Sequence, residues 1–171
     1  LGQGTIAIEL IEQFENMNRS DGNGGGDGGE SINTHLDAVV VSVGGGGLSS
    51  GVSSVLKELS PQTKVYIVEA TGAPSMHESL KQNELVTLDS VNTICEGLAT
   101  KRVSQRTFDY VRNNTEQSFL VSDKASMDAL REVLQYDKQL TEPSTSCSVA
   151  ALPQILAYHN NKFGEPIKNL A

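Results

Sequence analysis

The most regular hydrophobic pattern of the chain lies between residues 36 and 69. Ala38 to Val43 is a largely β-branched run, which suits a strand buried on both faces, as in a parallel sheet covered by helices. Four consecutive glycines follow it, and a helix-compatible stretch at residues 48–59 then ends near Pro61. Lys64 to Glu69 reads as a second strand. A strand, a helix and a strand in this order predict parallel strands joined by a right-handed crossover.

The rest of the chain continues the alternation of helices and strands. We expect helices from Thr5, at 75–82, at 104–113, from Ser122 or Asp123, and at 144–160, with a third strand at 117–121. On the helix after Ser122, the expected buried stripe is Met127, Leu130, Val133 and Leu134. Pro153 should kink or restart the last helix. The fold class is therefore α/β, with a parallel sheet and helices on both faces.

Size and charge exclude several classes of protein. A chain of 171 residues suits one domain with a sizeable core. A formal net charge of -8 argues against nucleic acid and acidic membrane surfaces as partners. Cys95 and Cys147 lie far apart without metal-type spacing, so we expect reduced thiols in a cytoplasmic protein. The sequence has no pattern of a transmembrane span or a signal peptide.

Residues 20–31, SDGNGGGDGGES, form a second glycine-rich segment. It follows no predicted strand and opens no predicted helix, and Asp21, Asp27 and Glu30 would repel a phosphate. We therefore expect a flexible surface insertion at residues 20–31.

The glycines after the first strand, Gly44, Gly45, Gly46 and Gly47, have a different context. Without Cβ atoms the backbone can adopt positive φ and approach a ligand closely. Leu48 then opens a helix whose first N–H groups have no partner within the helix. These donors and the positive end of the helix dipole predict an anion site, most often one for phosphate. The alternative is a tight turn that binds nothing, for which two glycines would serve.

Three further segments accompany this glycine loop: GQGTIA at residues 2–7 with Glu9, TICEGLA at 93–99, and Glu142-Pro143-Ser144 before VAA at 149–151. In this order the chain resembles the serine/threonine dehydratase and serine racemase family, pyridoxal-phosphate enzymes of fold type II, also called the tryptophan-synthase-β type. Lys101-Arg102-Val103 followed by Thr107-Phe108 is more similar to the threonine dehydratase branch.

The resemblance implies that residues 1–171 are part of the large cofactor-binding domain, in its C-terminal part. It implies a pyridoxal 5'-phosphate-dependent dehydratase, an ammonia-lyase of L-threonine or L-serine. Such an enzyme removes the α-proton and eliminates the β-hydroxyl, giving a 2-oxo acid and ammonia. It also implies a cytoplasmic homo-oligomer, a dimer or tetramer, whose other partner is the amino-acid substrate.

Several site residues follow from the resemblance. The glycines at 44–47 and the Leu48 amide would hold the cofactor phosphate, Gly97 would lie beside the cofactor ring, and Glu142 would approach its pyridine side. An ordinary acid at a helix start is the alternative for Glu142. Some relatives bind Mg or Ca through a strand-end glutamate, a carbonyl four residues on and an acid two beyond. The matching residues here are Glu69, Ala73 and Ser75, and Ser75 replaces the charged ligand that a hard cation prefers.

The family chemistry also needs a Schiff-base lysine, in a motif that resembles Ser-Phe-Lys-x-Arg-Gly. None of the eight lysines has this context, and relatives carry the lysine upstream of the segment that matches residues 2–5. No catalytic residue is therefore assigned within this chain. Thr145, Ser146 and Cys147 stand where relatives usually have Gly or Ala, and would narrow the space beside the cofactor or offer it new hydroxyl and thiol contacts.

Three alternatives stay open at this point. The first is serine racemase activity, and the second is a non-catalytic pseudoenzyme or partner chain, since the lysine is absent. The third is a dinucleotide-binding domain, because Gly44-x-Gly46-x-x-Ser49 nearly meets the GxGxxG spacing and Glu69 ends the next strand. The third glycine of that motif is missing.

Overall fold

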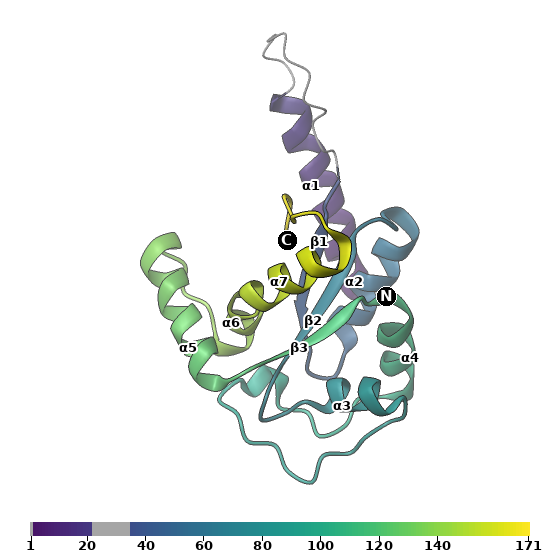
Figure 1. Cartoon of the computed structure of the whole chain (residues 1–171), viewed down its shortest axis with the longest axis vertical. Helices are drawn as coiled ribbons and strands as arrows, with labels where there is room; N and C mark the ends of the chain where they lie inside the picture. Colours follow the sequence, from purple (N-terminus) through teal and green to yellow (C-terminus); the bar gives the residue numbers. More distant parts are fainter. Residues whose placement is uncertain (1, 22–34) are drawn as a thin grey trace.

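The computed structural model describes residues 2–21 and 35–171 (Figure 1). A three-stranded parallel sheet of order β1-β2-β3 lies at its centre, formed by β1 (Ala38–Ser42), β2 (Lys64–Ala70) and β3 (Gln117–Val121). Val39 pairs with Val65, and Ile67 pairs with Ser118. The predicted parallel strands are confirmed. On the outer side of β1, Leu170 forms a parallel bridge to Ala38.

Both faces of the sheet are buried, because successive side chains of a strand point to opposite faces. From β2, Val65 and Ile67 face one side, whereas Tyr66 and Val68 belong to the cluster on the other. All four side chains are at most 3% exposed.

Helices cover the two faces. Their bounds are η1 (Gly2–Gly4), α1 (Thr5–Asp21), α2 (Gly47–Leu59), α3 (Ser75–Gln82), η2 (Glu96–Leu98), α4 (Gln105–Asn114), α5 (Asp123–Glu132), η3 (Val133–Asp137), α6 (Pro143–Ala150) and α7 (Leu152–Phe163). Helices α1 and α2 pack on Val39, Val41 and Val65, α3 and α4 cover Ile67, and α6 and α7 cover Tyr66. Figure 1 shows α1 extending away from the sheet.

Two glycines let the start of α1 approach α2 closely. A Cβ at Gly4 would lie 2.8 Å from Val55 Cγ2, and one at Gly51 would lie 2.9 Å from the Gly4 nitrogen. The glycine-rich insertion predicted at 20–31 lies outside the described residues from position 22 onward, and residues 20 and 21 are the last two of α1.

The stripe predicted for the helix after Ser122 is wrong at Leu134, which is 45% exposed and follows α5, in η3. Met127, Leu130 and Val133 are only partly buried, and the buried positions of α5 are Ser126 and Ala129. The reason is that α5 packs against α6, and small side chains allow the two helices to approach closely. Ser126 Oγ donates a hydrogen bond to the Pro143 carbonyl at the start of α6. The restart predicted at Pro153 is confirmed, because α6 ends at Ala150 and α7 begins at Leu152.

Candidate functional site

A pocket of about 290 Å³ opens where β1 ends, between α2, η2 and α6. In open α/β sheets, ligands bind outside the carboxyl ends of the strands. The pocket lining comes from three segments that are far apart in the sequence: Ser42 with residues 44–48, then Gly97 and Leu98, and then Glu142, Ser144 and Thr145. All seven residues predicted to bind the cofactor therefore lie at this one pocket.

The four glycines divide into two pairs. A Cβ at Gly44 would lie 2.6 Å from the Gly97 carbonyl oxygen. Gly46 has a left-handed backbone, with φ of 83°, and a Cβ there would lie 2.9 Å from Met76 Cε. At Gly45 and Gly47 a Cβ would meet no described atom within 4 Å. Two glycines thus permit the close packing of the loop, and the other two leave its backbone open to the pocket.

The first turn of α2 supplies hydrogen-bond donors. Ser50 N donates to the Gly46 carbonyl at 3.0 Å and closes the turn. Gly46 caps the helix without a side-chain bond, and the first turn contains no acidic residue. Within the described part of the chain, no acceptor is found for the amides of Gly47, Leu48 and Ser49. Free amides at the positive end of a helix dipole form a site for an anion such as phosphate.

The opposite wall is tied together by serine hydroxyls. Gly97 N donates to Ser144 Oγ at 3.1 Å, and Ser42 Oγ donates to the Ser144 carbonyl at 2.9 Å. A Cβ at Gly97 would lie 3.0 Å from Ser144 Oγ, so a larger residue would push α6 away. The peptide of Gly97 is therefore held between Gly44 and Ser144.

Glu142 lies at the rim of this wall, at the N-cap of α6, with an exposed side chain. It is the one charged side chain among the described residues that line the pocket. Its carbonyl accepts the amides of Thr145 and Ser146, both at 3.1 Å, which fixes the start of α6 beside the pocket.

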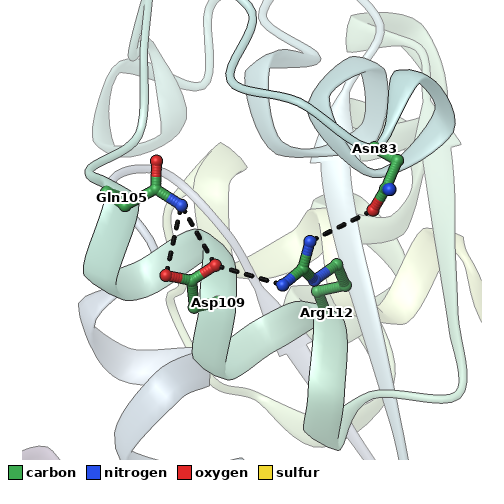
Figure 2. A network of polar contacts seen from close by, with 4 residues as sticks. All are labelled: Asn83, Gln105, Asp109 and Arg112. Atoms are coloured by element: carbon green, nitrogen blue, oxygen red, sulfur yellow. Dashed lines mark hydrogen bonds and ion pairs between the residues drawn. The ribbon is translucent and has the colours of Figure 1, made fainter.

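The helices that support the glycine loop are joined by a surface network (Figure 2). Arg112 Nη1 of α4 donates to Asn83 Oδ1, at the C-cap of α3, over 3.1 Å. Asp109 pairs with Arg112 Nη2 at 3.3 Å and accepts two bonds from Gln105. These side chains are exposed, and such pairs contribute about 0–1 kcal/mol each. The network helps to position the two helices whose side chains contact Gly46.

The predicted metal residues lie outside this pocket. Glu69 is 1% exposed, and its Oε1 and Oε2 accept the amides of Met76 (2.9 Å) and His77 (2.6 Å). Burial raises the pKa of Glu69 to about 7, although these two amide bonds act in the opposite direction. Ser75 Oγ is buried and has no hydrogen-bond partner among the described residues.

These residues do not fit a hard cation. With Ala73 they offer one carboxylate, one carbonyl and one hydroxyl, and both carboxylate oxygens already accept amide hydrogens. Nowhere in the described ranges do three or more His, Cys, Asp or Glu side chains gather as a metal site would require.

The three departures from the family pattern lie in different places. Thr145 lines the pocket, as expected for a residue that narrows it. Ser146 instead turns inward to Thr141 Oγ1, at 2.9 Å, and Cys147 is fully buried beside Cys95. Consecutive side chains of a helix point in different directions, so of these three residues only Thr145 narrows the pocket.

Three residues that line the pocket were not predicted as site residues, namely Ser42, Leu98 and Ser144. Ser42 and Ser144 join the walls through hydrogen bonds. The available signals were a polar residue at the end of an apolar strand, just before the glycines, and a serine directly after Glu142-Pro143. Neither signal reveals that the two segments meet.

Comparison with known proteins agrees with the geometry. Residues 1–166 match the model of the family described as "Pyridoxal-phosphate dependent enzyme". The chain belongs to this family of pyridoxal-phosphate-dependent enzymes. The family prediction is confirmed, and the dinucleotide-binding alternative gains no support from the match.

Among curated relatives, the biosynthetic L-threonine dehydratase of Salmonella typhimurium is 32% identical over 93% of this chain and 27% of its own length. The mitochondrial threonine dehydratase of Schizosaccharomyces pombe is 32% identical over 94% of this chain and 24% of its own length. The chain thus spans about a quarter of the length of these two relatives.

Solved structures support the same fold. The threonine deaminase of T.th. superposes with a TM-score of 0.80 at 29% identity, covering 99% of this chain and 54% of that one. Maize serine racemase superposes with a TM-score of 0.74 at 30% identity, and the match covers 88% of this chain and 41% of the racemase chain. The expected α/β fold of fold-type II pyridoxal-phosphate enzymes is confirmed. In the described residues, no helix has the length and apolar character to cross a membrane.

Proposed function

We propose that the full-length protein is a pyridoxal-phosphate-dependent dehydratase that converts L-threonine or L-serine to a 2-oxo acid and ammonia. The observation that carries the proposal is the start of α2, where amides without an acceptor among the described residues and the bare backbone of Gly45 and Gly47 face the pocket. The names of the dehydratase relatives support the reaction. When bound, the cofactor supplies an electron sink for the carbon that loses its proton.

In this proposal the glycine loop is the phosphate site. The amides of residues 44–47 and of Leu48 would donate hydrogen bonds to the phosphate oxygens, and the helix dipole would favour the negative charge. Because Gly45 and Gly47 lack side chains, the phosphate can approach the backbone directly. These contacts bind and orient the cofactor and take no part in proton transfer.

The second wall orients the ring. Gly97, held by Ser144 Oγ, would lie beside the ring, and Glu142, which lines the same pocket, would approach its pyridine side. Thr145 adds a hydroxyl that narrows the space for the substrate. Residues 1–171 are then part of the large cofactor-binding domain.

The group that takes the α-proton is the lysine expected upstream of Gly2, in the full-length protein. Its amine acts as a base near neutral pH only with a lowered pKa.

Cytoplasmic location and a homo-oligomer, a dimer or tetramer, complete the proposal. The two free cysteines support a reducing compartment. The acidic net charge of -8 supports the absence of nucleic acid as a partner.

The second candidate function is serine racemase activity, which the similarity to maize serine racemase favours. The two functions can be separated by assaying the full-length protein with L-threonine and L-serine, with and without magnesium. We expect 2-oxo acid and ammonia in equal amounts, and the same rate in both conditions, because the residues around Glu69 do not fit a cation.

A chiral assay of the same mixtures identifies the alternatives. Accumulation of D-serine without 2-oxo acid would replace the dehydratase by a racemase. Neither product, in a preparation that binds pyridoxal phosphate, would identify a pseudoenzyme.

A further inference from the structure

Two thiols meet in the core behind the pocket. Cys95 and Cys147 are 52 positions apart in the sequence, yet their Sγ atoms lie 3.7 Å from each other. Both side chains are 0% exposed and both cysteines are free. Ser126 Oγ of α5 lies 3.7 Å from Cys95 Sγ and accepts its weak hydrogen bond.

The pair lies directly behind the wall that faces the cofactor pocket. Cys95 is the N-cap of η2, two residues before Gly97, and Cys147 lies on α6 one turn after Ser144. The hydrogen bond from Gly97 N to Ser144 Oγ joins the same two segments on the pocket side. Formation of a bond between the two sulfurs would therefore pull on the two segments that form this wall.

We propose that Cys95 and Cys147 are a site of oxidative modification, at which a hydroperoxide forms a disulfide that distorts the η2–α6 wall and weakens cofactor binding. The site itself is independent of the reaction catalysed, whereas the effect on cofactor binding rests on the proposed function. The disulfide would regulate cofactor binding, a property that neither the family match nor the relatives' names describe.

The geometry explains why the cross-link would reach the pocket. A disulfide bond is roughly 2.05 Å long, so the two sulfurs must approach each other by more than about 1.5 Å. Protein interiors are close-packed, so the backbone segments must take up part of this movement. The Gly97 carbonyl has little room, because it lies against Gly44, where a Cβ would be only 2.6 Å away. Movement of η2 is therefore transmitted to the glycine loop.

The reaction balances with one hydroperoxide. A thiolate sulfur attacks the peroxide oxygen, the O–O bond breaks, and a sulfenic acid and an alkoxide or hydroxide form, the latter taking up the proton that the thiol lost. The second sulfur then attacks the sulfenic sulfur, the S–O bond breaks, and water leaves with the proton of the second thiol. Two thiols and one hydroperoxide give one disulfide, one alcohol or water molecule, and one further water molecule.

Burial sets the speed of this reaction. Loss of hydration raises the pKa of the Cys147 thiol to about 12, and the neighbouring Cys95 contributes in the same direction. The reactive thiolate is therefore scarce, and a small oxidant must enter through local opening of the η2 segment. We expect oxidation over minutes to hours, and a disulfide that is shielded from reductants once it has formed.

Hydrogen peroxide provides the test, on the full-length protein. After native oxidation, a non-reducing digest is searched by mass spectrometry for the peptide pair joined through Cys95 and Cys147. Pyridoxal phosphate affinity is measured by absorbance titration before and after oxidation. The expected result is the linked pair, a loss of affinity of about tenfold, and slow recovery during prolonged incubation with dithiothreitol. Cys147→Ala and Cys95→Ala should each keep their affinity under the same treatment.

Two results would overturn the inference. One is the absence of the linked peptide after prolonged native oxidation, and the other is a linked protein whose affinity equals that of oxidised Cys147→Ala. If the reduced protein binds no pyridoxal phosphate, the proposed function fails instead. The linked peptide and a changed hydrogen-exchange rate of the Gly97 amide then decide whether the disulfide forms and moves the wall.

Discussion

At Gly44 and Gly46 a methyl group would collide with neighbours, whereas at Gly45 and Gly47 it would enter open space. The run of four glycines predicts an anion site from sequence alone, but it does not reveal this division of roles. The reason is physical: the neighbours that exclude a side chain, Gly97, Met76 and Thr107, come from other segments and are brought in only by folding.

This division predicts that two alanine substitutions affect different properties, one the stability of the protein and the other its affinity for the cofactor. Gly46→Ala should lower the free energy of unfolding by about 1–3 kcal/mol, because alanine is strained at positive φ and its Cβ meets Met76. Gly47→Ala should leave stability within about 0.5 kcal/mol but reduce pyridoxal phosphate affinity about tenfold, because its methyl group enters the pocket. Urea unfolding and absorbance titration measure the two quantities. Unchanged affinity in Gly47→Ala would contradict the placement of the phosphate.

Glu69 predicts a pH dependence of stability. Its pKa in the folded protein is about 7, above the ordinary value of 4.5, so the folded state binds the proton more tightly than the unfolded state. The free energy of unfolding should therefore fall by up to about 3 kcal/mol as the pH rises from 4.5 through about 7. Glu69→Gln should flatten that slope in urea unfolding with EDTA present. If the free energy of unfolding of the wild-type protein varied with pH as that of Glu69→Gln does, the amide hydrogen bonds from Met76 and His77 would outweigh the effect of burial on the pKa of Glu69.

Ser75 allows the metal site to be tested by gain of function. Magnesium or calcium should leave the thermal midpoint of the apo wild-type protein unchanged, because a single carboxylate with both oxygens bonded is a poor ligand set. Ser75→Asp should gain stabilisation by millimolar magnesium, since it adds a charged oxygen ligand. Ser75→Asn, similar in size but neutral, is the matched control. Stabilisation of the wild-type protein by either cation would show that the site does bind a metal.

At the scale of elements, periodicity predicts the strands and most helix bounds well, since these depend on local sequence. The strand at 117–121 and the helix at 75–82 have the predicted limits. The α5 stripe fails because the partner of α5 is α6, whose surface near the contact is small and polar. A rule that assigns the largest apolar side chains to the core has no information about this partner.

Two substitutions test which side chains of α5 and of the following η3 are buried. Leu134→Gln should change the free energy of unfolding by no more than about 0.5 kcal/mol, because this side chain is 45% exposed. Ala129→Leu should destabilise by about 1–3 kcal/mol, because Ala129 is 5% exposed and a larger side chain overpacks its surroundings. Chemical denaturation of both variants checks the pair. If Leu134→Gln proves the more damaging, the predicted stripe is buried in the full-length protein after all.

At the scale of the whole molecule, the order of strands and helices could be predicted, and the glycine loop and two segments of the resemblance, at 93–99 and 142–151, pointed to one site. Their meeting could not be derived from pattern, because Ser42, Gly97 and Ser144 are separated by 47 or more positions and joined by tertiary hydrogen bonds. The contact between Cys95 and Cys147 has the same origin: two isolated thiols in the sequence become neighbours only when α6 packs on the sheet.

The central claim is that the start of α2 binds the phosphate of the cofactor. A crystal structure of the full-length protein with pyridoxal phosphate tests it most directly. Phosphate oxygens should lie within about 3 Å of the amide nitrogens at Gly45, Gly47 and Leu48. A phosphate bound elsewhere, with these amides facing only solvent, would contradict it.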